Sequence, residues 1–140
     1  MDVLKVKLDE GAFVPVRAHK EDAGLDLFAT ESKIIHAFSM ETFDTGVHVE
    51  IPEGYYGRLE SKSGLNVKYG IFCPGGTIDS GYSGSMVVAL YNGTAENYLV
   101  HKGDKICQLV ICPCETPNVE IVESIKAGDR GDNGFGSTGR

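Results

Sequence analysis

Residues 70–92 read GIFCPGGTIDSGYSGSMVVALYN, and this stretch indicates the class of fold. The adjacent glycines Gly75 and Gly76 follow Pro74 and predict a tight hairpin. Residues 86–90 then form a continuous apolar run, which is typical of a strand that is buried on both faces. Short apolar runs that are separated by glycine turns favour β-structure over helices.

The same pattern continues on both sides of this stretch. Residues 45–51 alternate between the two faces of an expected strand, and residues 106–112 form a second continuous apolar run. Only residues 61–68 have the pattern of a helical turn, which Ser61 or Ser63 can cap. Many short strands with frequent turn signals predict an all-β fold, a jelly-roll-like β-barrel or sandwich with one short helix.

The length and the last residues define the expected domain organisation. A chain of 140 residues is long enough for one domain. Residues 128–140 read GDRGDNGFGSTGR and are nearly devoid of apolar side chains, so they cannot form a core of their own. We therefore predict a β-domain over residues 1–127 and a flexible C-terminal arm over residues 128–140.

Composition and charge exclude several classes of partner. The formal net charge is -7 and no basic stripe is present, so nucleic acid is not the expected partner. No apolar run approaches the roughly 20 residues of a membrane span, and no signal peptide precedes the first strand. We therefore expect a cytoplasmic protein without a membrane partner. The four cysteines and four histidines lack the spacing of a zinc site, and reduced, mostly buried thiols are expected.

Two segments in the first half of the chain contain candidate binding groups. Asp26 stands between two leucines, where a carboxylate either reaches the water shell of a metal ion or is simply solvated. Lys62, Ser63 and Gly64 offer a cation, a hydroxyl and unpaired backbone amides to an anion. The alternative for this second segment is an ordinary helix start.

Three segments in the second half add further candidates. Asp79 and Tyr82 follow the glycine hairpin, although Asp-Ser-Gly-Tyr can also be a plain turn. Gln108 is an amide within an apolar run and is either satisfied in the core or in contact with a ligand. Around Phe135, which can stack on a flat base, glycines and hydroxyls resemble a phosphate cradle, but the Gly-Lys-[Ser/Thr] end of a Walker loop is missing.

All five segments, in this order, resemble the five motifs of the trimeric dUTPase family. The strings DAGLDL, KSGL, TIDSGY, GDKICQL and RGDNGFGSTG carry this resemblance, which runs from Val14 to Gly139. It implies a β jelly roll that assembles into a homotrimer with active sites at the subunit interfaces. It also implies hydrolysis of dUTP to dUMP and pyrophosphate with Mg²⁺ as cofactor. That reaction keeps uracil out of DNA and supplies dUMP for thymidylate synthesis.

The resemblance also implies a role for each matching residue. Asp79 matches the general base that activates water for in-line attack on the α-phosphate, and Asp26 matches the acid that holds Mg²⁺ through water. Tyr82 matches the residue whose ring leaves no room for a ribose 2′-hydroxyl. The implied substrate-binding residues are Lys62, Ser63, Gly64, Gly76, Thr77, Ile78, Tyr82, Met86, Gln108, Arg130, Phe135, Gly136, Ser137 and Thr138.

Three positions depart from the family pattern, and for one of them, Glu60, we have no functional account. Lys62 stands where arginine is usual, so a bidentate phosphate contact becomes a point charge. Cys73 stands where many relatives have asparagine, so backbone groups are expected to read the base.

Three alternatives to dUTP hydrolysis are a deaminase, a non-catalytic binding protein and a module without nucleotide chemistry. A dCTP deaminase shares the implied fold, but its glutamate base corresponds to Ala89 here, and alanine cannot transfer protons. A non-catalytic binding protein could use the same trimer, although the presence of Asp79 and Tyr82 argues against that role. A capsid-like or lectin-like module would not order its tail with a nucleotide.

Overall fold

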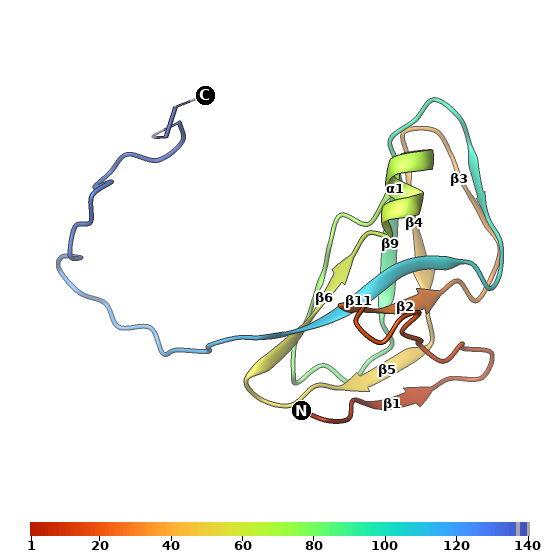
Figure 1. Ribbon diagram of the computed structural model, residues 1–140, viewed down its shortest axis with the longest axis horizontal. Coiled ribbons are helices and arrows are strands. Elements are labelled where there is room, and N and C mark those ends of the chain that lie inside the picture. Colours follow the sequence, from red (N-terminus) through yellow and green to blue (C-terminus); the bar gives the residue numbers. More distant parts are fainter. Residues whose placement is uncertain (137, 140) are drawn as a thin grey trace.

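The computed structural model describes residues 1–136 and 138–139, and within them the chain folds into short strands and one helix (Figure 1). This confirms the predicted all-β class. The strands and the helix, in chain order, are β1 (Lys5–Leu8), β2 (Gly24–Phe28), β3 (Lys33–Ile35), β4 (Met40–Asp44), β5 (Val47–Glu50), β6 (Tyr55–Glu60), α1 (Ser63–Tyr69), β7 (Ile71–Phe72), β8 (Thr77–Ile78), β9 (Val87–Asn92), β10 (Tyr98–Val100) and β11 (Lys105–Pro113).

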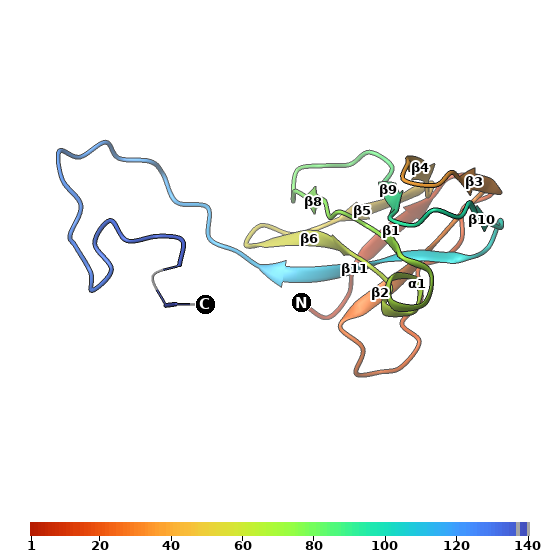
Figure 2. The same ribbon diagram turned by 90° about the horizontal axis from the view of Figure 1, so that it is seen from above.

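The strands pair only in antiparallel fashion within the described residues and form two main layers. One sheet has the strand order β2-β11-β6-β8 and the other has the order β4-β9-β7. The pairs β1–β5 and β10–β3 complete the body, with β1 and β5 at the end opposite to α1 (Figures 1 and 2). The sheets form a sandwich and do not close into a barrel.

Side-chain alternation accounts for the core. The four side chains that share one face of residues 45–51 are all buried, as the period of two predicts: Thr45, Val47, Val49 and Ile51. The apolar runs in β9 and β11 were predicted to be buried on both faces. In β11, none of residues 106–112 is exposed, whereas the prediction is wrong for β9 in the single chain. There, Val88 is fully buried and Val87 is 50% exposed, because the other layer covers this sheet on one face only.

The helix begins differently from the prediction. Lys62 is its N-cap residue, and no side chain caps it. The hydroxyl of Ser61 instead accepts a hydrogen bond from the amide of Cys73 at 2.9 Å and donates to the carbonyl oxygen of the same residue at 3.2 Å. Gly70, with φ 66°, ends α1 in the left-handed conformation.

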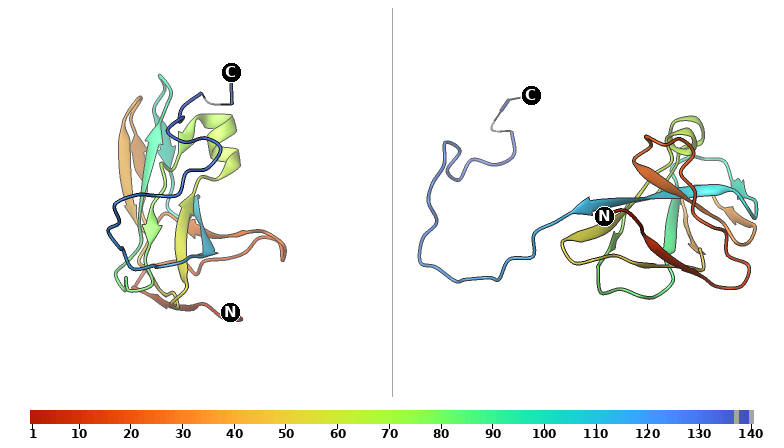
Figure 3. Two further views of the ribbon diagram at one scale, coloured as in Figure 1. Left: turned by 90° about the vertical axis from the view of Figure 1, so that its left-hand side faces the viewer. Right: turned by 60° about the horizontal axis from the view of Figure 1, so that its bottom comes forward.

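The C-terminal segment extends away from the body (Figures 1 and 3). β11 ends at Pro113, and the described residues beyond it form neither strand nor helix. Val119, Ile121 and Ile125 are 93%, 94% and 86% exposed, so this chain alone does not bury them. The predicted boundary between residues 127 and 128 lies within this segment. Among the described residues, no helix is long and apolar enough to cross a membrane.

Candidate active site

Asp26 is a buried carboxylate at the centre of a charge cluster with two partly exposed lysines. Its side chain is on β2, and the residue is only 2% exposed. The ammonium group of Lys62 donates to Oδ1 at 2.5 Å, and the Nζ atom of Lys105 lies 3.2 Å from Oδ2. A buried carboxylate needs such compensation, because transfer from water costs it several kcal/mol. The alternative of a simply solvated carboxylate is therefore wrong, and Lys105 is a member of the cluster that the sequence did not reveal.

Gln108 lies next to this cluster. It faces Asp26 across the β2–β11 pairing, and its amide Nε2 donates to the backbone oxygen of Ser61 at 2.9 Å. Gly24 makes room for this side chain, because a Cβ atom there would lie 2.3 Å from the Oε1 atom of Gln108. The β2–β11 pairing thus brings Asp26 and Gln108 together, and the adjoining segment adds Lys62. The need for glycine at position 24 was not predicted.

The carboxylate of Asp26 suits a cation whose other ligands do not come from the protein. Among the described residues, no three His, Cys, Asp or Glu side chains are grouped so that they could hold a metal ion. One buried carboxylate with two ammonium neighbours fits Mg²⁺ that is bound by phosphate oxygens and water, a binding mode that this ion favours. Asp26 is the residue that would hold such an ion, through water.

The glycine hairpin is attached to the edge of β6. The amide of Leu59 donates to the carbonyl oxygen of Gly76 at 3.0 Å, and Ile78 pairs with Gly57. A Cβ atom at Gly76 would lie 3.2 Å from the side chain of Leu59, so the backbone approaches β6 closely. Thr77 is exposed while Ile78 is buried, which leaves backbone groups of the hairpin at the surface.

The loop that follows, residues 79–86, presents Asp79 and Tyr82. Asp79 is exposed, and its carbonyl oxygen accepts a hydrogen bond from the amide of Tyr82 at 3.0 Å. The phenol of Tyr82 donates to the carbonyl oxygen of Ser85 at 2.7 Å, and the ring is 44% exposed. Met86 is fully buried, so its side chain anchors the loop and has no surface in this chain that could face a ligand.

Two thiols meet beneath the hairpin. Cys73 and Cys107 are both buried, and all four cysteines are free, as predicted, while Cys112 and Cys114 are partly buried. The neighbouring Cys107 thiol lowers the pKa of Cys73, while Cys73 and burial raise the pKa of Cys107. Cys73, one of the positions that depart from the family pattern, is therefore the thiol of the pair that loses its proton more readily.

The chain alone does not bring all of the candidate residues together. Asp26 lies on β2, whereas Asp79 follows β8, three strand positions away in the order β2-β11-β6-β8. At about 4.8 Å per strand, the backbones of β2 and β8 are about 14 Å apart. The arm residues Arg130, Phe135, Gly136 and Thr138 lie on the segment that extends away from the body, and Ser137 is outside the described residues (Figure 3).

Comparison with known proteins identifies the family. The family model described as dUTPase matches residues 11–139. This chain belongs to the dUTPase family. The deoxyuridine 5′-triphosphate nucleotidohydrolase of Clostridium tetani is 43% identical over 140 residues, which cover 98% of this chain and 97% of that protein. The corresponding dUTPase of Paramecium bursaria Chlorella virus 1 is 40% identical over 137 residues, which cover 98% of this chain and 97% of that protein.

Solved dUTPase structures share the fold. A point mutant of the Staphylococcus bacteriophage 80alpha dUTPase with dUpNHpp superposes with a TM-score of 0.92, at 32% identity over all of both chains. A point mutant of the dUTPase from phage phi11 of S. aureus, a structure that shows the coordination of a structural Mg(II) ion, has a TM-score of 0.82 at 33% identity and matches 88% of this chain and 98% of that one. The resemblance and the jelly-roll class are therefore confirmed, while the roles of single residues stay predictions.

Proposed function

We propose that this dUTPase-family chain hydrolyses dUTP to dUMP and pyrophosphate, by attack of an Asp79-activated water on the α-phosphate. The observation that carries the proposal is the loop 79–86, which presents an exposed carboxylate and an exposed tyrosine directly after the glycine hairpin. The relatives that share nearly the full length are deoxyuridine 5′-triphosphate nucleotidohydrolases, which supports the same substrate.

The chemistry requires a base and an aligned nucleophile. The carboxylate of Asp79 accepts a proton from water, whose oxygen forms a bond to the α-phosphorus opposite to the leaving pyrophosphate. The bond from the α-phosphorus to its bridging oxygen breaks, so the water oxygen ends in dUMP. An exposed aspartate suits this step, because its carboxylate is accessible to a bound water.

The charge cluster around Asp26 is the proposed phosphate end of the site. When bound, Mg²⁺ supplies charge neutralisation of the triphosphate. Asp26 holds it through water, and Lys62 contributes its positive charge with Ser63, Gly64 and Gln108 to the phosphates. The ion pair of 2.5 Å between Lys62 and Asp26 supports this arrangement, since it fixes the ammonium group beside the carboxylate. Because an ammonium cannot form the bidentate contact of arginine, we expect a weaker hold on phosphate.

The hairpin and Tyr82 are the proposed determinants of base and sugar. Backbone groups at Gly76, Thr77 and Ile78 read the edge of uracil, and the close approach of the hairpin to β6 leaves no room for the 5-methyl group of thymine. Cytosine is rejected because its amine reverses a donor and an acceptor. The ring of Tyr82 excludes a 2′-hydroxyl.

A homotrimer with shared sites is the proposed assembly. Asp79 and the Asp26 cluster lie at opposite edges of the sheet β2-β11-β6-β8, and this separation favours a site that is completed by another copy. The exposed apolar side chains of residues 119–125, on a segment that leaves its own body, support packing against a neighbouring copy. The arm then closes over the nucleotide with Phe135 on uracil and with Arg130, Gly136, Ser137 and Thr138 around the γ-phosphate.

The proposed metabolic role follows from this reaction. Hydrolysis of dUTP keeps uracil out of DNA and supplies dUMP for thymidylate synthesis. A cytoplasmic location and the absence of a nucleic-acid partner stay predictions.

The proposal is tested by pyrophosphate release from dUTP, dCTP, dTTP and UTP in parallel with Mg²⁺, while ammonia is measured in the same samples. We expect pyrophosphate from dUTP, with the other three nucleotides at least about a hundredfold slower in kcat/KM. Ammonia from dCTP would instead establish a deaminase, and no product from any nucleotide would indicate a binding protein.

A glycine substitution tests the role assigned to Tyr82. A Cβ atom at Gly84 would lie 2.5 Å from the phenol oxygen of Tyr82, so Gly84→Ala must displace the ring. We expect the ratio of kcat/KM for dUTP to that for UTP to fall by about tenfold, because the ring no longer blocks the 2′-hydroxyl. Gly81→Ala is the matched control in the same loop, since nothing lies within 4 Å of its Cβ position. An unchanged ratio in Gly84→Ala would contradict the role of Tyr82.

A further inference from the structure

The loop that carries Asp79 and Tyr82 is fastened at its end by the β4–β5 turn. The amide and the hydroxyl of Thr45 donate to the carbonyl oxygen of Met86 at 3.0 and 2.7 Å, and the amide of Met86 donates to Val47 at 2.9 Å. The hydroxyl of Ser85 also donates to the carboxylate of Asp44. These contacts hold residues 85 and 86, but they leave the middle of the loop to another partner.

That partner is His48, on β5. Its Nδ1 lies 2.7 Å from the carbonyl oxygen of Ser83, and its Nε2 lies 3.0 Å from Oδ1 of Asp9. A carbonyl oxygen and a carboxylate oxygen only accept hydrogen bonds, so both ring nitrogens must donate. The ring is therefore a doubly protonated imidazolium when both contacts are made. The side chain is 21% exposed, so it is largely shielded from water.

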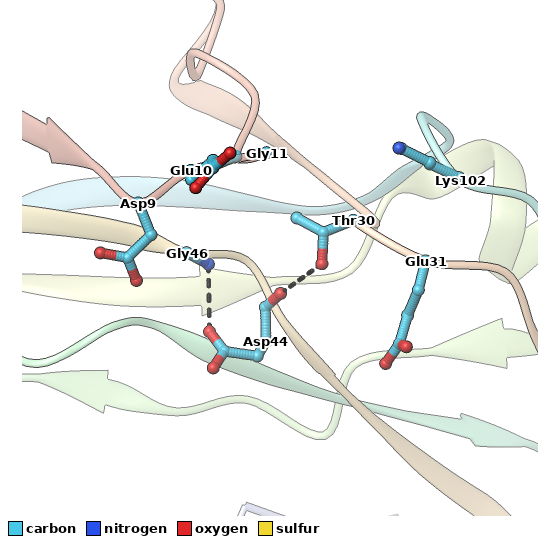
Figure 4. Close-up of a pocket in the computed structure, with 9 residues that line it drawn as sticks. Asp9, Glu10, Gly11, Thr30, Glu31, Asp44, Gly46 and Lys102 are labelled. Atoms are coloured by element: carbon cyan, nitrogen blue, oxygen red, sulfur yellow. Dashed lines mark hydrogen bonds between the residues drawn. The ribbon is translucent and has the colours of Figure 1, made fainter.

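The position of Asp9 is fixed by its own backbone. The amide of Asp9 donates to the carbonyl oxygen of Gly46 at 2.8 Å, just after β1 has paired with β5. Figure 4 shows the side chains of Asp9 and Asp44 on either side of Gly46, and Asp44 accepts a hydrogen bond from the amide of Gly46 at 3.0 Å. His48 therefore connects a fixed carboxylate on one side to the loop on the other.

The charges around the ring favour its protonated form. Three ionisable groups interact electrostatically with the ring: Lys7, Asp9 and Asp44. Lys7 lies opposite His48 in the β1–β5 pairing. The hydrogen bond to the carbonyl of Ser83 and, to a smaller extent, the one to the carboxylate of Asp9 raise the pKa of His48 above its ordinary value of 6.5. Burial and the like charge of Lys7 lower this pKa but do not cancel the increase. The charged ring therefore stabilises its contacts with Ser83 and Asp9 fully below about pH 6.5. This stabilisation is lost as the pH rises through the raised pKa of His48.

We propose that His48 is a positioning residue that holds the loop of Asp79 and Tyr82, so that loss of one ring proton relaxes discrimination between dUTP and UTP. The inference rests on the proposed function. The carboxylate of Asp9 is the stronger acceptor, so the last proton stays on Nε2. The lone pair of Nδ1 then faces the carbonyl oxygen of Ser83 at 2.7 Å and repels it. Tyr82 is the adjacent residue and moves with Ser83.

The test is the ratio of kcat/KM for dUTP to that for UTP, measured from about pH 6 to about pH 9 on the full chain. Both nucleotides carry the same base and triphosphate and use the same Asp79, so those ionisations cancel in the ratio. We expect the ratio to fall by about tenfold with rising pH, as one charge-assisted hydrogen bond is replaced by repulsion.

Two variants separate positioning from charge. Asp9→Asn allows a neutral ring to donate from Nδ1 to Ser83 while Nε2 accepts from the new amide, so the ratio stays high at every pH. His48→Ala removes the contact altogether, and we expect a low ratio at every pH with kcat/KM for dUTP reduced by about tenfold. His36→Ala, at an exposed histidine, is the matched control and keeps the profile of the unmodified chain.

The inference can fail independently of the proposed function. A flat ratio in a chain that hydrolyses dUTP, or a pH-dependent ratio in Asp9→Asn, would overturn it. If neither nucleotide is hydrolysed, the proposed function fails, and NMR decides the positioning role. Backbone amide signals of residues 79–86 should then follow the titration of His48 in the unmodified chain and stay constant in Asp9→Asn. Amide signals of residues 79–86 that do not change as His48 titrates would refute the positioning role.

Discussion

Asp79→Asn is expected to lower kcat for dUTP by at least about two powers of ten. An asparagine keeps the size of the side chain but cannot take a proton from water. Nucleotide affinity should stay within about threefold, since the phosphates and the base are bound elsewhere. Pyrophosphate release measures kcat, and calorimetric titration with non-hydrolysable dUpNHpp measures the affinity.

A neighbouring exposed residue supplies the control for this variant. Ser80 follows Asp79 in the same loop and is also exposed, so Ser80→Ala should keep both turnover and affinity. Equal turnover of Asp79→Asn and the unmodified chain would overturn the assignment of the base. A parallel loss of affinity in Asp79→Asn would indicate that the loop, rather than the proton transfer, was damaged.

Deletion of residues 130–140 is expected to lower kcat/KM for dUTP by about a hundredfold or more. The deletion removes the aromatic ring that we propose stacks on the base, a contact worth about 1–3 kcal/mol, together with the proposed phosphate contacts of the arm. Phe135 is fully exposed, so the body should keep its fold and its thermal unfolding midpoint. Unfolding scans and light scattering check the fold and the assembly, and substrate kinetics check the loss.

Mixing the two defective chains tests whether sites are shared. When Asp79→Asn chains and arm-deleted chains assemble together, some sites receive an intact Asp79 from one chain and an intact arm from another. We expect activity to return in co-expressed mixtures purified by a tag on each chain. Mixtures that stay inactive would show that Asp79 and the arm of a site belong to the same chain.

The local pattern of the sequence predicted most of the fold. The alternation in residues 45–51 placed the right side chains in the core, because a strand's period of two is set by the backbone alone. The apolar run of β9 was misjudged, because composition does not say whether a second layer or a subunit covers the outer face. The predicted serine cap of α1 is absent, since the hydroxyl of Ser61 bonds to Cys73, twelve residues away.

The candidate site was predicted by motifs but not by its contacts. Asp26 was singled out as a candidate, yet its burial and its pairing with Lys105 depend on which strands lie side by side. The contact between His48 and Ser83 joins residues that are 35 positions apart, and no periodicity indicates it. Gly24 acts only through the Cβ atom that it lacks, which becomes meaningful once Gln108 is seen opposite.

Hydrolysis of dUTP in water enriched in oxygen-18 tests the central claim most directly. Attack on the α-phosphorus places the water oxygen in the nucleotide product, so mass spectrometry should find the label in dUMP and none in pyrophosphate. Label in pyrophosphate, or formation of a product other than dUMP and pyrophosphate, would contradict an Asp79-activated water acting on the α-phosphate.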